Sequence, residues 1–160
     1  IPANFIPAIE KGIKETLQKG IIAGFIATDI KVSVYDGTYH EVDSSEMAFK
    51  LAGAYAIKDA FKAAKPLVLE PIMKFEVNTP SEFFFFFIGD LSSRRGQING
   101  TEDSHGFTTI HAFVPLESIS GYATTIRSLT QGRGSFYMEP CRYDPVPRDI
   151  QEKLTKTTNE

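Results

Sequence analysis

The 160-residue sequence predicts an α+β protein built from two small domains. Apolar residues recur with helical spacing in some stretches and alternate with polar residues in others, and the two patterns follow one another along the chain. The segment AAKPLVLEP, residues 63–71, separates two such series with a pair of prolines that stiffen an extended connection. We therefore expect a first domain over residues 1–65, a second over residues 66–147 and a polar C-terminal tail over residues 148–160.

The first domain is predicted to begin with an amphipathic helix and then a strand. The apolar side of the helix consists of Ile6, Ile9, Ile13 and Leu17. Pro7 lies in the first turn, where its missing N–H costs little, and Gly20 ends the helix. The apolar face of the half-buried strand that follows consists of Thr28, Ile30, Val32 and Val34. Because the chain opens on a helix with no strand before it, we expect a piece of a longer protein.

A second helix is predicted after the loop YDGTYHEVDSSE, residues 35–46. Asp43 and Glu46 have the spacing of a capping box, with Asp43 as the cap. The apolar stripe of this helix consists of Ala48, Leu51, Ala52 and Tyr55. The first domain is thus predicted as helix, strand, loop and helix.

The second domain is predicted to start with a strand and a helix. Alternation gives Met73, Phe75 and Val77 an inward position and Lys74 and Glu76 an outward one. Thr79 is the expected cap of the helix, with Pro80 at its first position and Glu82 completing the box. Gly96 is expected to end this helix.

Two strands, a helix and a last strand complete the second domain. The residues GQING, 96–100, are predicted as a short strand, and the core face of the next strand consists of Ile110, Ala112 and Val114. The helix that starts at Pro115 and stops near Gly132 has an apolar stripe of Leu116, Ile119, Ala123 and Ile126. Pro140 lies in the last strand, with Phe136 and Met138, and requires an edge position. The order β-α-β-β-α-β is that of a ferredoxin-like sandwich, in which two helices cover one face of an antiparallel sheet.

Five consecutive phenylalanines, Phe83–Phe87, fall in the first helix of this domain. Helical residues advance by about 100° each, so no single core face can bury all five rings. Two interpretations remain open: two or three rings in the core with the others exposed, or a patch that contacts a protein partner.

Charge and motifs exclude several classes of protein. The net charge of −3 argues against a protein held to nucleic acid by its overall field. The sequence has no GxxxxGK[ST] motif, so it lacks a P-loop nucleotide site. No metal site is expected, because the histidines have no ligand spacing with one another or with Cys141. His111 is instead predicted on a strand in a partly buried hydrogen-bonding role.

No apolar run approaches the roughly 18 residues that span a bilayer, so a soluble protein is expected. A single cysteine can form no internal disulfide and is consistent with a reducing compartment.

The loop at residues 35–46 is the first candidate site. His40 beside Glu41, with Asp36 and Asp43 nearby, has three interpretations: a general acid–base pair, a binding tip or a polar turn. Adjacent side chains on extended backbone point in opposite directions, so His40 and Glu41 are badly placed to share a proton. A binding tip and an ordinary surface turn both remain open, and the residues concerned are Gly37, Thr38, Tyr39, His40, Glu41 and Val42.

Two segments, SSRRGQ at residues 92–97 and TQGRGS at residues 130–135, form the second candidate site. Small residues beside arginine let backbone N–H groups and guanidinium groups approach phosphates closely. Each segment is also an adequate helix C-terminus, where glycine ends the helix and arginine favours the dipole. Both interpretations are open from the residues alone.

Longer motifs resemble a known family along the whole chain. They are YDGTYHEVDSSEMAFKLAG, LEPIMKFEV, IGDLSSRRGQI, FVPL, GYAT, RSLTQGRGSFYME and YDPVP. Together and in this order they resemble the C-terminal end of bacterial-type translation elongation factor G. The sequence departs from the family's usual pattern at Phe85 and Phe86, where residues are usually smaller or polar, and at Ile119 and Ser120.

The resemblance implies a fold and a role for each domain. Residues 1–65 would be the later part of the fourth domain, which has an αβ fold found also in the second domain of a small-subunit ribosomal protein. Its tip, residues 37–42, would reach the decoding region beside tRNA and mRNA. Residues 66–147 would be the ferredoxin-like fifth domain, whose expected contacts with ribosomal RNA are Arg94, Arg95, Gly96, Gln131, Gly132, Arg133 and Gly134.

The family is a GTPase that moves tRNA and mRNA through the ribosome. The resemblance therefore implies ribosome, tRNA and mRNA as partners, a cytoplasmic monomer, and no catalytic residue or cofactor in this chain, because GTP and Mg²⁺ bind in N-terminal domains of the family. Alternatives are a recycling or ribosomal-protection paralogue, a small enzyme that uses His40 with Glu41 or Asp43, and a protein-binding module that uses Phe83–Phe87.

Overall fold

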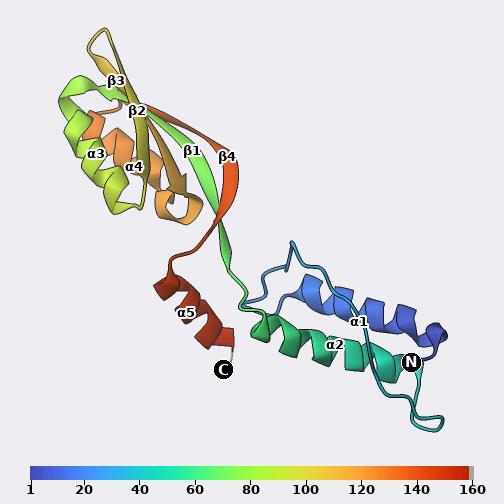
Figure 1. Ribbon diagram of the computed structural model, residues 1–160. Helices are drawn as coiled ribbons and strands as arrows, with labels where there is room; N and C mark the ends of the chain where they lie inside the picture. Colours follow the sequence, from blue (N-terminus) through green and yellow to red (C-terminus); the bar gives the residue numbers. More distant parts are fainter. Residues whose placement is uncertain (159–160) are drawn as a thin grey trace. The chain divides into compact units, whose positions relative to one another are not determined.

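The computed structural model describes residues 1–158, which form two compact units (Figure 1). Unit 1 comprises Ile1–Val68 together with the segment that begins at Pro147, and unit 2 comprises Leu69–Val146. Unit 1 is helical and unit 2 combines a sheet with helices, so the predicted α+β class is confirmed. Among the described residues, no helix has both the length and the apolar character needed to cross a bilayer.

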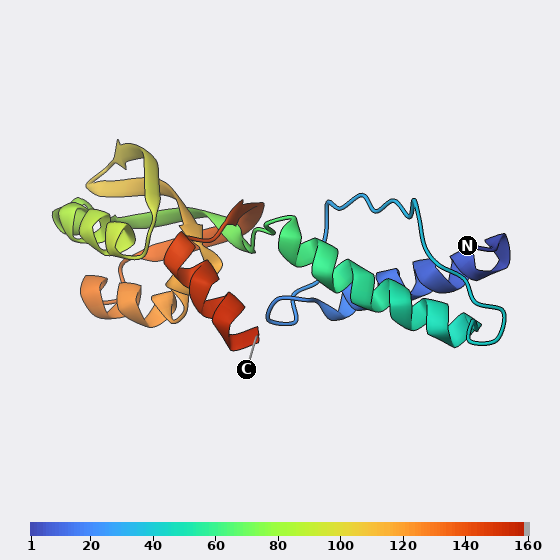
Figure 2. The ribbon, with the colours of Figure 1, turned by 60° about the horizontal axis from the view of Figure 1, so that its bottom comes forward.

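Two parallel helices form the body of unit 1 (Figures 1 and 2), with the Phe5 ring at the start of the first stacked on Phe49 in the first turn of the second. A short 3₁₀ turn, η1 (Ala3–Phe5), leads into α1 (Ile6–Lys19), which ends at Gly20 as predicted, and α2 spans Glu46–Ala63. The helices lie side by side (Figures 1 and 2) around a small core of Ala8, Ile9, Ile13, Phe49 and Ile57. A Cβ on Gly12 would overlap the Lys50 carbonyl, and one on Gly53 would lie 2.8 Å from the Ile9 carbonyl oxygen. Glycine at both positions therefore allows the two backbones to touch.

The strand predicted around residues 28–35 is wrong. The segment between α1 and α2 contains no helix or strand, and Ile30, Val32 and Val34 are each more than 40% exposed. A strand needs a neighbour that pairs with its backbone N–H and C=O groups. Within the described residues no strand pairs with this segment, so the alternating pattern is left without a sheet.

The predicted start of α2 needs a correction. Ser45, rather than Asp43, is the cap: its hydroxyl oxygen accepts a 3.0 Å hydrogen bond from the Ala48 N–H. Ser45 has the extended backbone of a cap residue, whereas Asp43 belongs to the preceding turn.

The predicted apolar stripe of α2 is also wrong. The buried residues are Phe49, Gly53 and Ile57, whereas Ala48, Leu51, Ala52 and Tyr55 are exposed. Alpha2 has apolar residues on two sides, and α1 packs against the side that carries Gly53, because only there can the backbones approach closely.

Unit 2 has the predicted β-α-β-β-α-β order, which confirms the ferredoxin-like sandwich. Its elements are β1 (Leu69–Pro80), η2 (Ser81–Phe83), α3 (Phe84–Ser93), β2 (Gln97–Ser104), β3 (Phe107–Pro115), η3 (Leu116–Ile119), α4 (Tyr122–Thr130) and β4 (Ser135–Pro145). The sheet is antiparallel with strand order β2-β3-β1-β4, and α3 and α4 lie on the same face of it (Figure 1). Beta4 is an edge strand, as Pro140 requires.

The core of unit 2 lies between this face and the two helices. Met73, Phe75 and Val77 are buried as predicted, and Lys74 and Glu76 lie on the opposite face. The Phe75 and Tyr122 rings meet edge to face with 5.0 Å between centroids. The other buried members are Phe87, Leu91, Ile110, Ala112, Val114, Ile119 and Ile126.

Both ends of α3 differ from the prediction. Thr79 is no cap: β1 continues to Pro80, and the fully buried Thr79 hydroxyl donates to the Pro80 carbonyl at 3.3 Å. At the other end Arg95, not Gly96, takes the left-handed conformation, with φ of 61°. Gly96 is still needed, because a Cβ there would lie 2.7 Å from the Leu91 carbonyl oxygen.

The long helix predicted from Pro115 is broken into η3 and α4. Gly121, with φ of 72°, separates them and shifts the register of the apolar face. Tyr122 is therefore buried and Ala123 exposed, contrary to the predicted stripe.

The phenylalanine run divides as the helical geometry requires. Phe87 is fully buried, and Phe83 and Phe84 pack against the core from partly buried positions. Phe85 and Phe86 are 82% and 52% exposed. The prediction that one face cannot bury all five is confirmed.

Candidate functional sites

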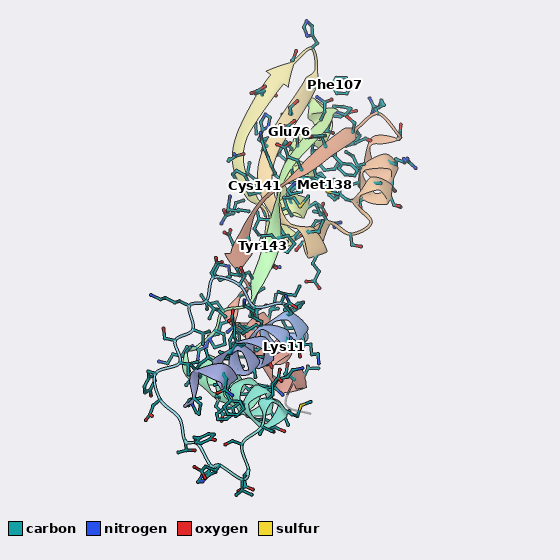
Figure 3. The ribbon with its side chains drawn as sticks, turned by 90° about the vertical axis from the view of Figure 1, so that its right-hand side faces the viewer. Lys11, Glu76, Phe107, Met138, Cys141 and Tyr143 are labelled. Atoms are coloured by element: carbon teal, nitrogen blue, oxygen red, sulfur yellow. The ribbon has the colours of Figure 1, made fainter. Side chains whose placement is uncertain are left out.

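The first candidate site is the loop between α1 and α2. All six predicted tip residues, 37–42, are exposed, and Val42 is 93% exposed. Figure 3 shows this coil running outside the helix pair, with its side chains spread along it. The loop therefore offers an aromatic ring, an imidazole and a carboxylate to an external partner.

Local hydrogen bonds hold the tip in a defined turn. The His40 N–H donates to the Ser44 hydroxyl and the Ser44 N–H donates to the His40 carbonyl, both at 3.0 Å. The Tyr39 ring lies 6.0 Å from the Phe5 ring, which stacks on Phe49 of α2 at 4.5 Å. The turn is thus attached to the helix pair through aromatic contacts.

Acid–base chemistry finds no support in this loop. Within the described residues the imidazole of His40 has no hydrogen bond to Glu41 or Asp43. All three side chains are exposed to water, whereas catalytic acids and bases are usually sheltered in a cleft beside a charged partner.

Arg94 is held within unit 2. Its Nε donates to Asp90 Oδ2 at 3.0 Å, and its Nη1 donates to the Ser118 carbonyl at 2.8 Å. The guanidinium carbon lies 5.0 Å from the centre of the Tyr122 ring. Only 22% of the side chain is exposed. Arg94 therefore joins the end of α3 to the start of α4.

A buried tyrosine lies beside this arginine. Burial, with a smaller effect of the Asp90 carboxylate, raises the pKa of Tyr122 far above its ordinary value, and Arg94 opposes this in part. Among the described residues the Tyr122 hydroxyl has no hydrogen-bond partner. Arg94 thus packs on the face of the ring and gives the hydroxyl no hydrogen bond.

The other two predicted arginines lie nearer to solvent. Arg95 donates to both oxygens of Glu70, at 2.7 and 2.9 Å. Arg133 donates to Glu82 at 2.7 Å, half of its side chain is exposed, and its guanidinium lies 5.6 Å from the Phe83 ring centre. Only 12% of the Glu70 side chain is exposed, whereas both partners of the Arg133 pair are at least half exposed, so the Arg133 pair is the one expected to contribute little to stability.

The turn at residues 131–134 is tightly folded. Gln131 and Gly132 both have positive φ, and the Gly134 N–H donates to the Thr130 hydroxyl at 2.8 Å. A Cβ on Gly134 would lie 2.9 Å from the Thr130 side chain, so the close turn requires glycine.

The two arginine-bearing turns lie at opposite ends of the sheet. Residues 94–96 lead into β2, which enters the sheet near the start of β1, where Glu70 binds Arg95. Residues 131–134 lead into β4, whose Ser135 pairs with Asn78 near the end of β1. The structure therefore does not bring these seven predicted residues together into one cluster.

His111 occupies β3 in a partly buried position, as predicted. Its Nδ1 lies 3.3 Å from Glu76, which Figure 3 labels on β1, and its Nε2 lies 3.6 Å from Glu102 on β2. In the part of the chain that the structure describes, no group of three potential metal-ligating side chains comes together.

Sequence reasoning missed the role of Tyr122 beside Arg94. The four-residue spacing of Asp90 and Arg94 on a helix was a usable signal for their ion pair. The contacts with Ser118 and Thr125, the latter at 3.4 Å, join residues far apart in sequence and had no such signal.

Comparison with known proteins gives a consistent match over nearly the whole chain. The family model for Elongation factor G, domain IV, matches residues 1–65, and the model for Elongation factor G C-terminus matches residues 67–154. The chain is 54% identical over 154 residues to Elongation factor G of Aquifex pyrophilus, covering 96% of this chain and 22% of that protein.

A solved structure has the same fold. A crystal structure of a protein from Thermus thermophilus matches with a TM-score of 0.78 and 38% identity, covering 99% of this chain and 24% of that one. The chain thus spans less than a quarter of the length of either relative.

Proposed function

Since this chain belongs to the elongation factor G family and corresponds to its domain IV and C-terminal parts, we propose that it is the ribosome-contacting end of a translational GTPase. In this proposal the whole factor promotes the movement of tRNA and mRNA during protein synthesis. The chain contributes contacts with the ribosome and steric occupancy, and no catalytic residue is assigned to it.

The observation that supports this role most directly is the exposed turn at residues 37–42. A tip that displaces or holds tRNA must be accessible, and every residue of this turn is. His40 and Tyr39 offer stacking and hydrogen-bonding groups of the kind used with unpaired nucleotides. We assign this tip to the decoding region, beside tRNA and mRNA.

Unit 2 is assigned to ribosomal RNA. Arg133 presents its guanidinium group in an exposed ion pair that phosphate can replace, and Arg95 presents one in a partly exposed pair with Glu70. Arg94 is assigned a supporting role, because its donors are already used inside the unit. The backbone of Gly96, Gln131, Gly132 and Gly134 shapes the two turns.

GTP and Mg²⁺ are assigned to parts of the factor outside these residues, because this sequence has no P-loop motif. A cytoplasmic location and a monomeric state complete the proposal. The 54% identity to Elongation factor G favours translocation over a recycling or ribosomal-protection role.

The tip is tested with His40→Ala in the full-length factor. We expect slower translocation with nearly unchanged ribosome-stimulated GTP turnover, because the tip acts after the nucleotide site is engaged. Lys11→Ala, an exposed change on α1, is the matched control and should alter neither rate. Equal loss of both activities in His40→Ala would reject the specific role of the tip.

The RNA contact is tested with Arg133→Glu. Arg148→Glu makes the same charge change at a side chain that is 94% exposed on α5 (Arg148–Thr158), outside unit 2. We expect Arg133→Glu to weaken ribosome binding at moderate salt well beyond the control. Equal affinities of the two variants would remove Arg133 from the site.

A further inference from the structure

The C-terminal segment forms a helix with one sheltered side. Alpha5 spans Arg148–Thr158, a segment predicted as a polar tail that is frayed or weakly helical. The partly buried residues follow a helical spacing and are Ile150, Gln151, Leu154 and Thr155. This helix belongs to unit 1, so the chain returns to unit 1 after it has completed unit 2.

Gln151 binds the backbone of the segment that leaves unit 1. Its side-chain Nε2 donates to the Pro66 carbonyl at 2.7 Å, and the Val68 N–H donates to its Oε1 at 3.1 Å. Only this orientation of the amide satisfies both backbone groups. Val68 is 8% exposed, so its N–H has little access to water and benefits from this acceptor.

A third hydrogen bond holds the far end of the helix. The Ala23 N–H, in the coil after α1, donates to the Thr158 hydroxyl at 2.8 Å. Alpha5 is therefore attached at both ends to parts of unit 1 that lie more than eighty residues earlier in the sequence.

The path of the chain gives these bonds a consequence. Units 1 and 2 are joined by two covalent connections, one between Val68 and Leu69 and one between Val146 and Pro147. If α5 were free, unit 2 would be tethered through the first connection alone. With α5 bound, both ends of unit 2 are fixed to the same body.

We propose that α5 is a latch, closed by the Gln151 amide on Pro66 and Val68, which limits the motion of unit 2 relative to unit 1. The latch places the bending points of the chain at the peptide bonds after Val68 and after Val146. It concerns the mechanics of this chain and does not depend on the proposed role in translocation.

The test compares Gln151→Ala with wild type in the 160-residue chain by NMR. Alanine preserves helix propensity, so α5 itself is not expected to unfold. Lys153→Ala, an exposed change two residues further along α5, is the control. Amide hydrogen exchange of Val68 reports the bond directly, and ¹⁵N relaxation gives a rotational correlation time for each unit.

We expect Val68 exchange to accelerate about tenfold or more in Gln151→Ala, because its acceptor is removed. The correlation times of the two units should also move apart in this variant, and Lys153→Ala should change neither measurement. Gln151→Glu keeps an acceptor for Val68 but loses the donor to Pro66, so it should protect the Val68 amide better than alanine does. Unchanged Val68 exchange in Gln151→Ala, or faster exchange with unchanged correlation times, would overturn the latch.

Discussion

Arg94 provides a direct test of whether an arginine in this chain serves the fold or an RNA contact. Arg94→Ala removes a donor from the Ser118 carbonyl and from Asp90, and a cation from the Tyr122 ring. Charged hydrogen bonds contribute about 1.5–3 kcal/mol, and a partly exposed cation–π contact about 0.5–1 kcal/mol. Because these contacts share one side chain and are not additive, we expect a loss of about 2–3 kcal/mol in the free energy of unfolding of unit 2.

Arg133→Ala is the matched comparison. It removes the ion pair with Glu82, a 3.3 Å hydrogen bond from Nε to the Thr130 carbonyl and a contact with the Phe83 ring. Because the side chain is half exposed, a cost of only about 0–1 kcal/mol is expected. Arg94→Lys keeps the charge but not the planar fork, so it should recover only part of the stability.

Urea unfolding measures these differences if the signal comes from unit 2. The chain contains no tryptophan. Phe86→Trp on α3, at a 52% exposed position, therefore adds a fluorescence probe to this unit in every variant. If Arg94→Ala costs no more than Arg133→Ala, the assignment of Arg94 to the fold is wrong. If the costs differ as expected, weaker ribosome binding by Arg94 variants cannot be taken as evidence of an RNA contact.

Two further changes test the packing of each unit. Tyr122→Phe removes a buried hydroxyl without a partner among the described residues and should raise the free energy of unfolding by about 1 kcal/mol near neutral pH. Burial raises the pKa of Tyr122 above its ordinary value of 10.0. The free energy of unfolding that comes from keeping this hydroxyl protonated is therefore complete below pH 10 and is lost as the pH rises above it. Urea titrations at neutral and alkaline pH should show that the free energy of unfolding falls less for Tyr122→Phe than for wild type. Gly12→Ala should destabilise unit 1 by about 1–3 kcal/mol, because the new Cβ would overlap the Lys50 carbonyl, which is part of the α2 backbone and cannot move without displacing the helix. Gly89→Ala on α3, where no atom lies within 4 Å of a new Cβ, should instead stabilise unit 2 by about 0.5–1 kcal/mol in thermal unfolding.

The topology of unit 2 was predictable because each strand carries its own signal and finds its partner within the same unit. Met73, Phe75 and Val77 alternate with polar residues, and β1 pairs with β3 on one side and β4 on the other. Pro140 indicated an edge strand, since a central strand would need its missing N–H. Local pattern and global pairing agree here.

Unit 1 shows where the same reasoning fails. Residues 28–35 carry a strand pattern, but alternation indicates only that a segment suits a sheet, and pairing depends on a second strand. Alpha2 has apolar residues on two sides, and its buried side is chosen by contact with α1 at Gly12 and Gly53. Such a choice depends on two helices together and cannot be read from either alone.

The candidate sites also differ in how far the sequence predicts them. Exposure of residues 37–42 follows from their place in a turn between two predicted elements, which is a local property. The different surroundings of Arg94 and Arg133 do not, because SSRRGQ and TQGRGS look alike in sequence. Arg94 is covered by η3 and α4, elements that follow it by more than twenty residues.

The positions of the two turns lead to a last prediction about RNA binding. Arg95 binds Glu70, and the turn of Arg133 ends at Ser135, which pairs with Asn78. At about 3.3 Å per residue, these points on β1 are roughly 26 Å apart. Contacts separated by such a distance act independently, so Arg95→Gln and Arg133→Gln should lower the free energy of ribosome binding additively, within about 0.5 kcal/mol, in the double variant. A double variant no weaker than the worse single one would mean that both arginines serve a single contact, which the arrangement of β1 does not allow.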